Sequence, residues 1–302
     1  MSAVNRKGAD PVSNRVRGML CILISAMSFA LMNTCIRLSG DIPSMQKAFF
    51  RNAVAVIFAF IIMKRRGISF RPPKPRHWKY LFARAGFGTM GLLCNFYAVD
   101  HLNLSYASML NKMSPFFAVI VSYFLLGEHL NAVQCVSVAA AFLGSLLIIK
   151  PNPVNMALVP SLIGLLGGFG AGVAYSFVRL MGRHGIESSL IVFVFSAFSC
   201  LICLPYFIIV HAAMTALQLC FLSLAGCCGC AGQFAITAAY KFAPAKEISV
   251  YDYTQVIFAA LLGWVLFRQL PDLFSILGYI IICGTGIFMF FYQKKAAEPA
   301  PL

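Results

Sequence analysis

The chain has very few acidic residues, and few charged residues of any kind for its length. Only nine of its 302 residues are Asp or Glu, and charged residues make up 11% of the sequence against 60% hydrophobic residues. A soluble domain typically carries about 25% charged residues and 45–50% apolar residues. This shortage excludes a water-soluble enzyme. Most of the nine acids also fall in predicted loops, tails or helix ends, so no carboxylate pair or nucleophile–base pair can be assembled. We therefore expect no enzymatic activity.

Basic residues are less scarce, and they give the chain a formal net charge of +15. A surplus of this size would suit a nucleic-acid-binding protein. In this chain, however, the Lys and Arg residues flank long apolar segments, and seven of them lie between Lys64 and Lys79. We interpret that cluster as an orientation signal that meets anionic lipid headgroups. The expected surroundings are a lipid bilayer, and nucleic acid is not an expected partner.

Ten segments are each long and apolar enough to cross a bilayer, which requires about 20 residues in a helix. They cover residues 18–37, 45–63, 80–99, 104–126, 132–149, 158–180, 188–210, 215–239, 247–267 and 272–292. The first segment is as long as the others and has no small-residue cleavage site, so we interpret it as a helix rather than a signal peptide. The sequence predicts an all-α integral membrane protein with ten transmembrane helices.

The distribution of basic residues predicts the orientation of these helices. If the N-terminus lies inside, 17 Lys and Arg residues fall in the inner segments and four in the outer loops. Short cytoplasmic loops carry an excess of Lys and Arg in membrane proteins. We therefore expect a multi-pass protein of the cytoplasmic (inner) membrane with both termini in the cytoplasm.

The two halves of the chain resemble each other. A shift of 140 residues aligns Tyr97–Leu130 with Thr237–Leu270 without a gap, and a shift of 142 sets Ile36–Gly40 on Val178–Gly182. This predicts two five-helix repeats, at 16–150 and 158–292, between cytoplasmic tails at 1–15 and 293–302. Because five is odd, the second repeat enters the bilayer inverted. Inverted repeats are typical of secondary transporters, which rock one half against the other around a site near the midplane.

Four short runs in the first repeat carry a family resemblance. The run of Arg84–Gly91 (RAGFGTMG), then Asn95–Ala98 (NFYA), Ser114–Ala118 (SPFFA) and Leu126–Glu128 (LGE) resembles the EamA-type transporters of the drug/metabolite transporter superfamily. The resemblance implies two inverted five-helix repeats around a central cavity lined mainly by helices 1, 3, 4, 6, 8 and 9. It does not name a substrate, because that family carries amino acids, nucleoside derivatives, vitamins and other metabolites.

The second repeat departs from this family pattern at two positions. Gln255 stands where the proline would be, and Arg268 stands where the glutamate would be. The loss of that glutamate argues against a symmetric role for Glu128 in the first repeat.

Two ionisable residues stand near the centres of predicted helices, where charge is costly to insert. Lys112 and Asp252 are 140 residues apart and therefore occupy equivalent positions of the two repeats. In one interpretation they pair directly and join the two halves. In another they bracket a zwitterionic solute, Lys112 on its carboxylate and Asp252 on its amino group. In a third interpretation, Asp252 takes up and releases a proton and thereby couples transport to a proton gradient.

Further polar residues of the predicted helices complete the candidate substrate site. Three of them flank the Lys112–Asp252 pair, and four are secondary candidates: Asn111, Tyr251 and Gln255, then Asn33, Tyr97, Tyr175 and Tyr240. Pro115 leaves a helical carbonyl without its partner and is expected to bend helix 4. Arg51, about two turns into helix 2, is a candidate for guarding the outer mouth. We expect Arg84 to be structural and to reach the cytoplasmic surface.

Other motifs are better explained by helix packing. Gly86, Gly88 and Gly91 match a dinucleotide fingerprint as a string, but they fall inside a predicted helix, without the preceding strand that such a site requires. All eleven Cys fall inside predicted helices and do not converge with His, so we expect no metal site and no cofactor. The small-residue face at Gly164 and Gly168 indicates close helix contact, either within the chain or in a homodimer.

Together these observations predict a secondary transporter of a small polar metabolite. An amino acid or an amino-acid derivative is the preferred substrate, because the two central charges suit a zwitterion. A nucleoside-like or vitamin metabolite, export of a cationic drug, and a membrane scaffold without transport activity are the alternatives. Proton coupling and dimerisation stay open at this stage.

Overall fold

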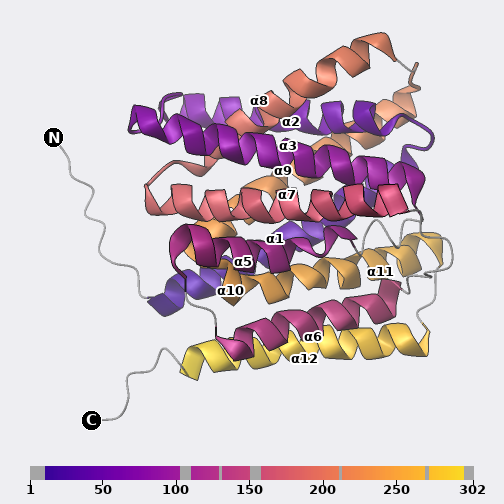
Figure 1. Cartoon of the computed structure of the whole chain (residues 1–302). Helices are drawn as coiled ribbons and strands as arrows, with labels where there is room; N and C mark the ends of the chain where they lie inside the picture. The colour runs from indigo at the N-terminus through magenta and orange to yellow at the C-terminus, as the bar shows by residue number, and fades with distance from the viewer. Residues whose placement is uncertain are drawn as a thin grey trace.

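The structure is a computed structural model that describes residues 11–102, 110–128, 131–149, 158–210, 213–268 and 272–295. In this part of the chain every regular element is a helix (Figure 1). The first half contains α1 (Pro11–Leu38), α2 (Ser44–Arg65), η1 (Pro75–His77), α3 (Trp78–His101), α5 (Ser114–Leu126) and α6 (Ala132–Ile149). The second half contains α7 (Leu158–Arg183), α8 (Ser188–Ile209), α9 (Ala216–Phe242), α10 (Ala245–Ile248), η3 (Ser249–Tyr253), α11 (Thr254–Phe267) and α12 (Leu273–Lys295). Parts of the predicted tails, and the start of the predicted helix at 104–126, lie outside the described residues.

The helices have the composition of membrane-spanning segments. Seven of those described are long and apolar enough to cross a bilayer, and α5 and α6 are shorter apolar helices. Large apolar side chains stand on the outer surface, where Phe124 and Ile209 are each 80% exposed. Lipid chains can cover such side chains without the cost that water would impose. The protein is therefore a multi-pass integral membrane protein.

The packing of the helices shows the relation between the two halves. In the predicted repeat, α1 corresponds to α7, α3 to α9, and α5 to α11. The structure packs α1 on α9 and α3 on α7, and it packs α5 on α7 and α1 on α11. The contacts α2–α8 and α6–α12 each join two equivalent helices. Exchange of the two halves therefore maps these six contacts onto one another, as expected for two inverted five-helix repeats.

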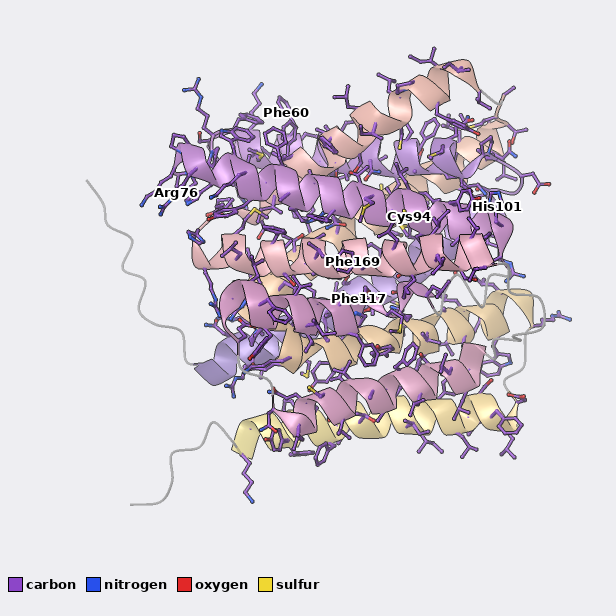
Figure 2. The ribbon with its side chains drawn as sticks, viewed as in Figure 1. Phe60, Arg76, Cys94, His101, Phe117 and Phe169 are labelled. Carbon is purple, nitrogen blue, oxygen red and sulfur yellow. The ribbon has the colours of Figure 1, made fainter. Side chains whose placement is uncertain are left out.

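The two ends of the helix bundle are distinguished by the chain termini. The first turn of α1 and the last turn of α12 lie at the same end, on the left of Figure 1, and we call this end the terminal face. Arg76 and His101 lie near opposite ends of α3, with Arg76 at the terminal face (Figure 2). Because successive long helices run antiparallel, the α1–α2 connection lies at the opposite face.

Both central helices are interrupted at equivalent positions. A turn at Lys112 and Met113 precedes α5, which begins at Ser114, and the 3-10 helix η3 precedes α11, which begins at Thr254. The two starts are 140 residues apart, so the continuous helices predicted at 104–126 and 247–267 are each broken in the same place. In the first repeat, Pro115 lies in the first turn of α5, where its missing N–H costs nothing.

Glycines allow α7 to approach two neighbours at backbone distance. A Cβ placed on Gly172 would lie 2.8 Å from the Ser114 carbonyl oxygen and 2.8 Å from the Ala118 nitrogen of α5. A Cβ on Gly91 of α3 would lie 2.9 Å from the Ala171 nitrogen. The small-residue faces are therefore used for contacts within the chain, and the Gly91 motif serves helix packing as expected.

Candidate functional site

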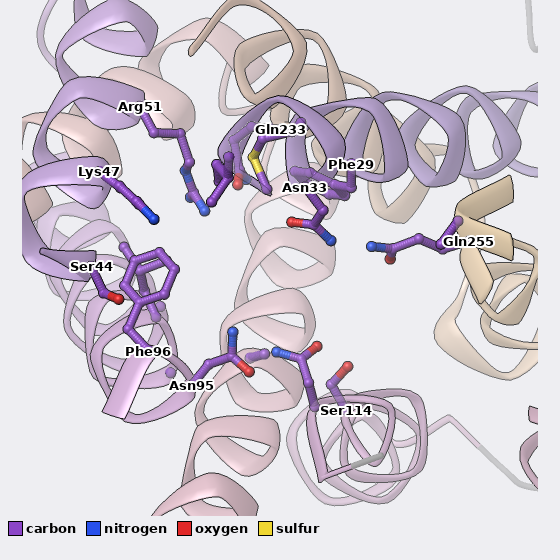
Figure 3. Close-up of a pocket in the computed structure, with 18 of the residues that line it drawn as sticks. Phe29, Asn33, Ser44, Lys47, Arg51, Asn95, Phe96, Ser114, Gln233 and Gln255 are labelled. Carbon is purple, nitrogen blue, oxygen red and sulfur yellow. The ribbon is translucent and has the colours of Figure 1, made fainter. Parts of the chain in front are cut away.

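A cavity of about 1030 Å³ lies between the two halves (Figure 3). Its lining comes from α1, α2, α3, α5, α7, α8, α9, η3 and α11. These include all six helices that the family resemblance implies, and they add α2 and α8. The polar ends of Lys47, Arg51, Asn33, Asn95 and Gln255 face into this space (Figure 3).

The cavity extends from the middle of the bundle to the face opposite the termini. Gly40, Asp41 and Ile42 of the α1–α2 connection line its outer part, and Lys112 and Asp252 line its inner part. Among the described residues, its lining includes none from the connections at the terminal face. This part of the chain therefore encloses a cavity that is open at the face opposite the termini.

Lys112 and Asp252 form a buried ion pair at the inner end of the cavity. The Lys112 Nζ lies 3.1 Å from the Asp252 Oδ2, and each side chain is 9% exposed. Lys112 also donates to the Asp252 backbone carbonyl at 3.2 Å and to the Gln255 Oε1 at 2.7 Å. These three acceptors satisfy all three N–H groups of the ammonium. Of the three sequence-based interpretations, the structure shows the direct pairing; it does not show Lys112 held apart from Asp252 by the length of a solute.

The interrupted helices bring further partners to this pair. The Tyr253 hydroxyl donates to the Lys112 backbone carbonyl at 3.0 Å, across the seam between the two repeats. Gln255, which replaces the proline of the first repeat, supplies the shortest hydrogen bond to Lys112. The departure of the second repeat from the family pattern therefore provides an acceptor that proline could not.

Most of the predicted site residues line the cavity, but Pro115 and three tyrosines do not. The lining includes Lys112, Asp252, Asn111, Gln255, Asn33, Tyr175 and Arg51. Tyr240 is buried behind Tyr175 and stacks on it with ring centroids 4.8 Å apart. Tyr97 is 37% exposed and stacks on His101, and Tyr251 is buried next to α12. These three tyrosines lie on elements that line the cavity, but their side chains face away from it. Helical periodicity alone could not separate them from the residues that face the cavity.

Arg84 is the functional candidate that sequence reasoning missed. Its place near the start of a predicted helix favours the cytoplasmic surface, but the side chain is only 2% exposed and lines the cavity. Its guanidinium carbon lies 4.0 Å from the centroid of the Phe195 ring of α8. The available signal was Gly88, four residues later on the same helix face, because a Cβ there would collide with the guanidinium.

The charged residues of the lining are mostly basic. Five are Lys or Arg and two are Asp: Arg37, Lys47, Arg51, Arg84 and Lys112, against Asp41 and Asp252. One acid at the inner end is already paired with Lys112. The cavity therefore presents positive charge to a solute.

At the terminal face, an ion-pair cluster joins the ends of α5 and α7. Arg183 Nη2 lies 2.6 Å from the Glu128 Oε1, and Arg179 Nε lies 3.3 Å from the same oxygen. Arg183 also donates to the Leu126 carbonyl, and Arg179 donates to the Lys241 carbonyl of α9. The cluster therefore ties α5, α7 and α9 together beneath the closed end of the cavity.

Comparison with known proteins places this geometry in a family. The model of the EamA-like transporter family matches residues 16–150 and 161–292. A pseudopaline exporter of Pseudomonas aeruginosa is 30% identical over 88% of this chain and 93% of its own length. A riboflavin transporter of Rhizobium johnstonii is 26% identical over 95% of this chain and 96% of its own length. A crystal structure of another protein matches the fold with a TM-score of 0.80 over 93% of this chain and 99% of that chain, at 13% identity. The chain belongs to the EamA-like transporter family.

Proposed function

We propose that this chain is a secondary transporter that moves an amino acid or an amino-acid derivative across the cytoplasmic membrane by alternating access. The observation that carries the proposal is the cavity between the repeats, which is lined in part by basic and amide side chains, is open at one face and ends at a buried ion pair near the seam. Inverted repeats allow such a cavity to open alternately to either side when one half rocks against the other.

The distribution of basic residues supports an outward-open state for this structure. The basic cluster between Lys64 and Lys79 follows α2, which ends at the terminal face. If that face lies in the cytoplasm, as the excess of inner Lys and Arg indicates, the cavity opens to the outside. The cluster of Glu128, Arg179 and Arg183 then closes the cytoplasmic side.

In this proposal the residues of the cavity have different tasks. Lys112 and Asp252 hold the two repeats together at the inner end. Asn33, Asn111 and Tyr175 contact the solute through amide and hydroxyl groups, which can donate or accept hydrogen bonds. A compact polar solute suits this lining, because every buried polar group of the solute needs a partner.

A vitamin is the second candidate substrate. The relative named as a riboflavin transporter supports it, and the aromatic lining residues Phe29, Phe96 and Phe195 could stack on a planar ring. Export of a cationic drug is disfavoured, because most of the charged residues that line the cavity are basic.

Transport by purified protein in proteoliposomes tests the proposal. Labelled amino acids, amino-acid derivatives and riboflavin would be measured in both directions, with and without a proton gradient. We expect an amino-acid-like solute to be transported, and dependence on the gradient would establish proton coupling. Transport of riboflavin alone would replace the preferred substrate, and movement of no solute in either direction would contradict the function.

A further inference from the structure

Two arginines of the cavity lining have no acidic partner in the described part of the chain. Arg84 lies on α3 and Arg51 on α2, and both line the cavity. The buried Nε and Nη1 of Arg84 have no hydrogen-bond partner among the described residues. Arg51 likewise forms no hydrogen bond or ion pair with that part of the chain. The two guanidinium groups are close enough to repel each other.

The fold makes room for each of these side chains. The guanidinium of Arg84 occupies the space that a side chain at Gly88 would fill, and it stacks on Phe195. A Cβ on Gly229 of α9 would lie 3.0 Å from the Arg51 Cγ. Glycines on two different helices therefore accommodate the two arginines. Stacking on Phe195 engages one face of the Arg84 guanidinium, whereas a carboxylate binds through the N–H edge.

An unpaired guanidinium group is costly in a buried position such as that of Arg84, and Arg51 is half-buried beside the same cavity. Proteins normally pair such buried charges. The nearby acid, Asp252, is already bound to Lys112. Tyr175 lies close enough to both arginines to interact with them electrostatically, and its hydroxyl can donate a hydrogen bond.

We propose that Arg51, Arg84 and Tyr175 form the binding site for a carboxylate of the transported solute. The planar guanidinium matches a carboxylate in a bidentate arrangement, and Tyr175 adds a third donor from α7. Arg51 and Arg84 belong to the first repeat and Tyr175 to the second. A ligand bound to all three would therefore contact both halves as they move relative to each other. This proposal rests on the transporter function proposed above and narrows its substrate to a carboxylate-bearing solute.

Ligand-dependent unfolding tests the site in purified protein. Sodium pyruvate, malonate, citrate and glutamate would be compared with sodium chloride at equal ionic strength. We expect at least one carboxylate to raise the unfolding midpoint of the wild type more than chloride does. Arg84→Gln and Arg51→Gln should each weaken that binding about 10- to 100-fold. Arg65→Gln, an exposed arginine on α2, is the matched control and should keep the full shift.

The midpoint without ligand separates a binding role from a structural role. If Arg84 serves to bind a solute, Arg84→Gln removes an unpaired buried charge and should leave the ligand-free midpoint unchanged or higher. If Arg84 is a structural cation–π element, the same variant should lower it. Arg84→Lys keeps the positive charge but loses the planar guanidinium that binds a carboxylate in a bidentate arrangement. It should therefore bind carboxylates better than Arg84→Gln but more weakly than the wild type.

The outcomes also separate this proposal from the transporter function. Transport of neutral or cationic solutes, with carboxylates excluded, would overturn the carboxylate site and leave the transporter intact. Equal carboxylate shifts in the wild type, Arg84→Gln and Arg51→Gln would overturn it as well. Absence of any transport would instead count against the function on which the site rests.

Discussion

At the level of single residues, the Lys112–Asp252 pair shows how a charge is kept inside the membrane. Equivalent residues of two inverted repeats can touch only near the axis that relates the repeats, and these two do so at 3.1 Å. Lys112 also donates a hydrogen bond to the Gln255 side chain, and the Tyr253 hydroxyl donates one to the Lys112 backbone carbonyl. The groups that contact the pair come from both halves, so the pair forms part of the interface between the two repeats.

Removal of one member of this pair should be worse than removal of both. We expect Lys112→Met to lower stability by about 3–5 kcal/mol, because the carboxylate of Asp252 is left buried and uncompensated. The double variant Lys112→Met/Asp252→Asn should recover most of that loss. Thermal unfolding in detergent measures both. A double variant as unstable as the single one would show that the pair is not what stabilises the seam.

The exchanged pair adds a test of ligand contact. In Lys112→Asp/Asp252→Lys, the attraction between the two positions is preserved but their charges trade places. If the pair only joins the helices, both stability and transport should return. Stability without transport would indicate that one of the two groups touches the solute.

His77 provides a second prediction, and it concerns pH. The residue precedes α3 at the terminal face, is buried, and has no hydrogen-bond partner for either ring nitrogen among the described residues. Burial lowers the pKa of His77 below its usual range, and the nearby His184, Arg76 and Lys74 lower it further. The unfolded chain takes up a proton near pH 6.5 and the folded chain resists it, so stability should fall as the pH drops below about 6.5.

Replacement of this histidine should reduce the acid sensitivity. We expect the unfolding midpoint of His77→Phe to fall less than that of the wild type between pH 7.5 and pH 5.5. His101→Phe, at the exposed far end of α3, is the control and should behave as the wild type does. An unchanged pH dependence in His77→Phe would contradict the assignment.

At the level of helices, the close contacts of α7 depend on glycine. Gly172 meets α5 at backbone distance, so neither partner can move aside without moving a helix. A Cβ placed on Gly86 of α3 or on Gly284 of α12 would have no atom within 4 Å among its described neighbours. The same residue type is therefore required at one position and dispensable at the others.

This difference predicts opposite effects of one substitution. Gly172→Ala should destabilise the protein by about 1–3 kcal/mol, because overpacking forces the helices apart. Gly86→Ala should be neutral or slightly stabilising, because alanine has the higher helix propensity. Unfolding midpoints of the two variants check the prediction. Equal effects would mean that the α5–α7 contact tolerates separation.

Across the molecule as a whole, the inverted repeat relates the closed end of the cavity to the open end. Glu128 and Arg183 form an ion pair at the terminal face. Their equivalents at the opposite face are Arg268, by the shift of 140, and Asp41, by the shift of 142. The charges are reversed but remain complementary. Both residues are exposed, and they form no ion pair within the described residues.

If the protein works by the alternating access proposed above, these two residues should meet when the face opposite the termini closes. Asp41→Arg should slow transport several-fold, and Asp41→Arg/Arg268→Asp should restore much of the rate. Asp41→Arg/Arg66→Asp has the same composition but changes the other face, so it should restore nothing. Transport in proteoliposomes gives the readout. Equal rates for the two double variants would exclude the Asp41–Arg268 contact.

The apolar helical segments, the two repeats and the equivalence of Lys112 and Asp252 could all be predicted from the order of residues alone, whereas the direct pairing of the two side chains could not. Apolar segments of about 20 residues and the 17-to-4 split of basic residues are local or additive properties, so they can be recognised without a fold. The equivalence of Lys112 and Asp252 follows from a single shift. These features do not depend on how helices face one another.

The packing of the helices determines which polar side chains enter the cavity. Arg84 turns inward because Gly88 leaves space and Phe195, from the other repeat, supplies a surface for stacking. Tyr97 and Tyr240 face elsewhere although their helices line the site. A side chain inside a bundle is placed by the neighbours that distant parts of the chain bring to it, and helical periodicity carries no information about those neighbours.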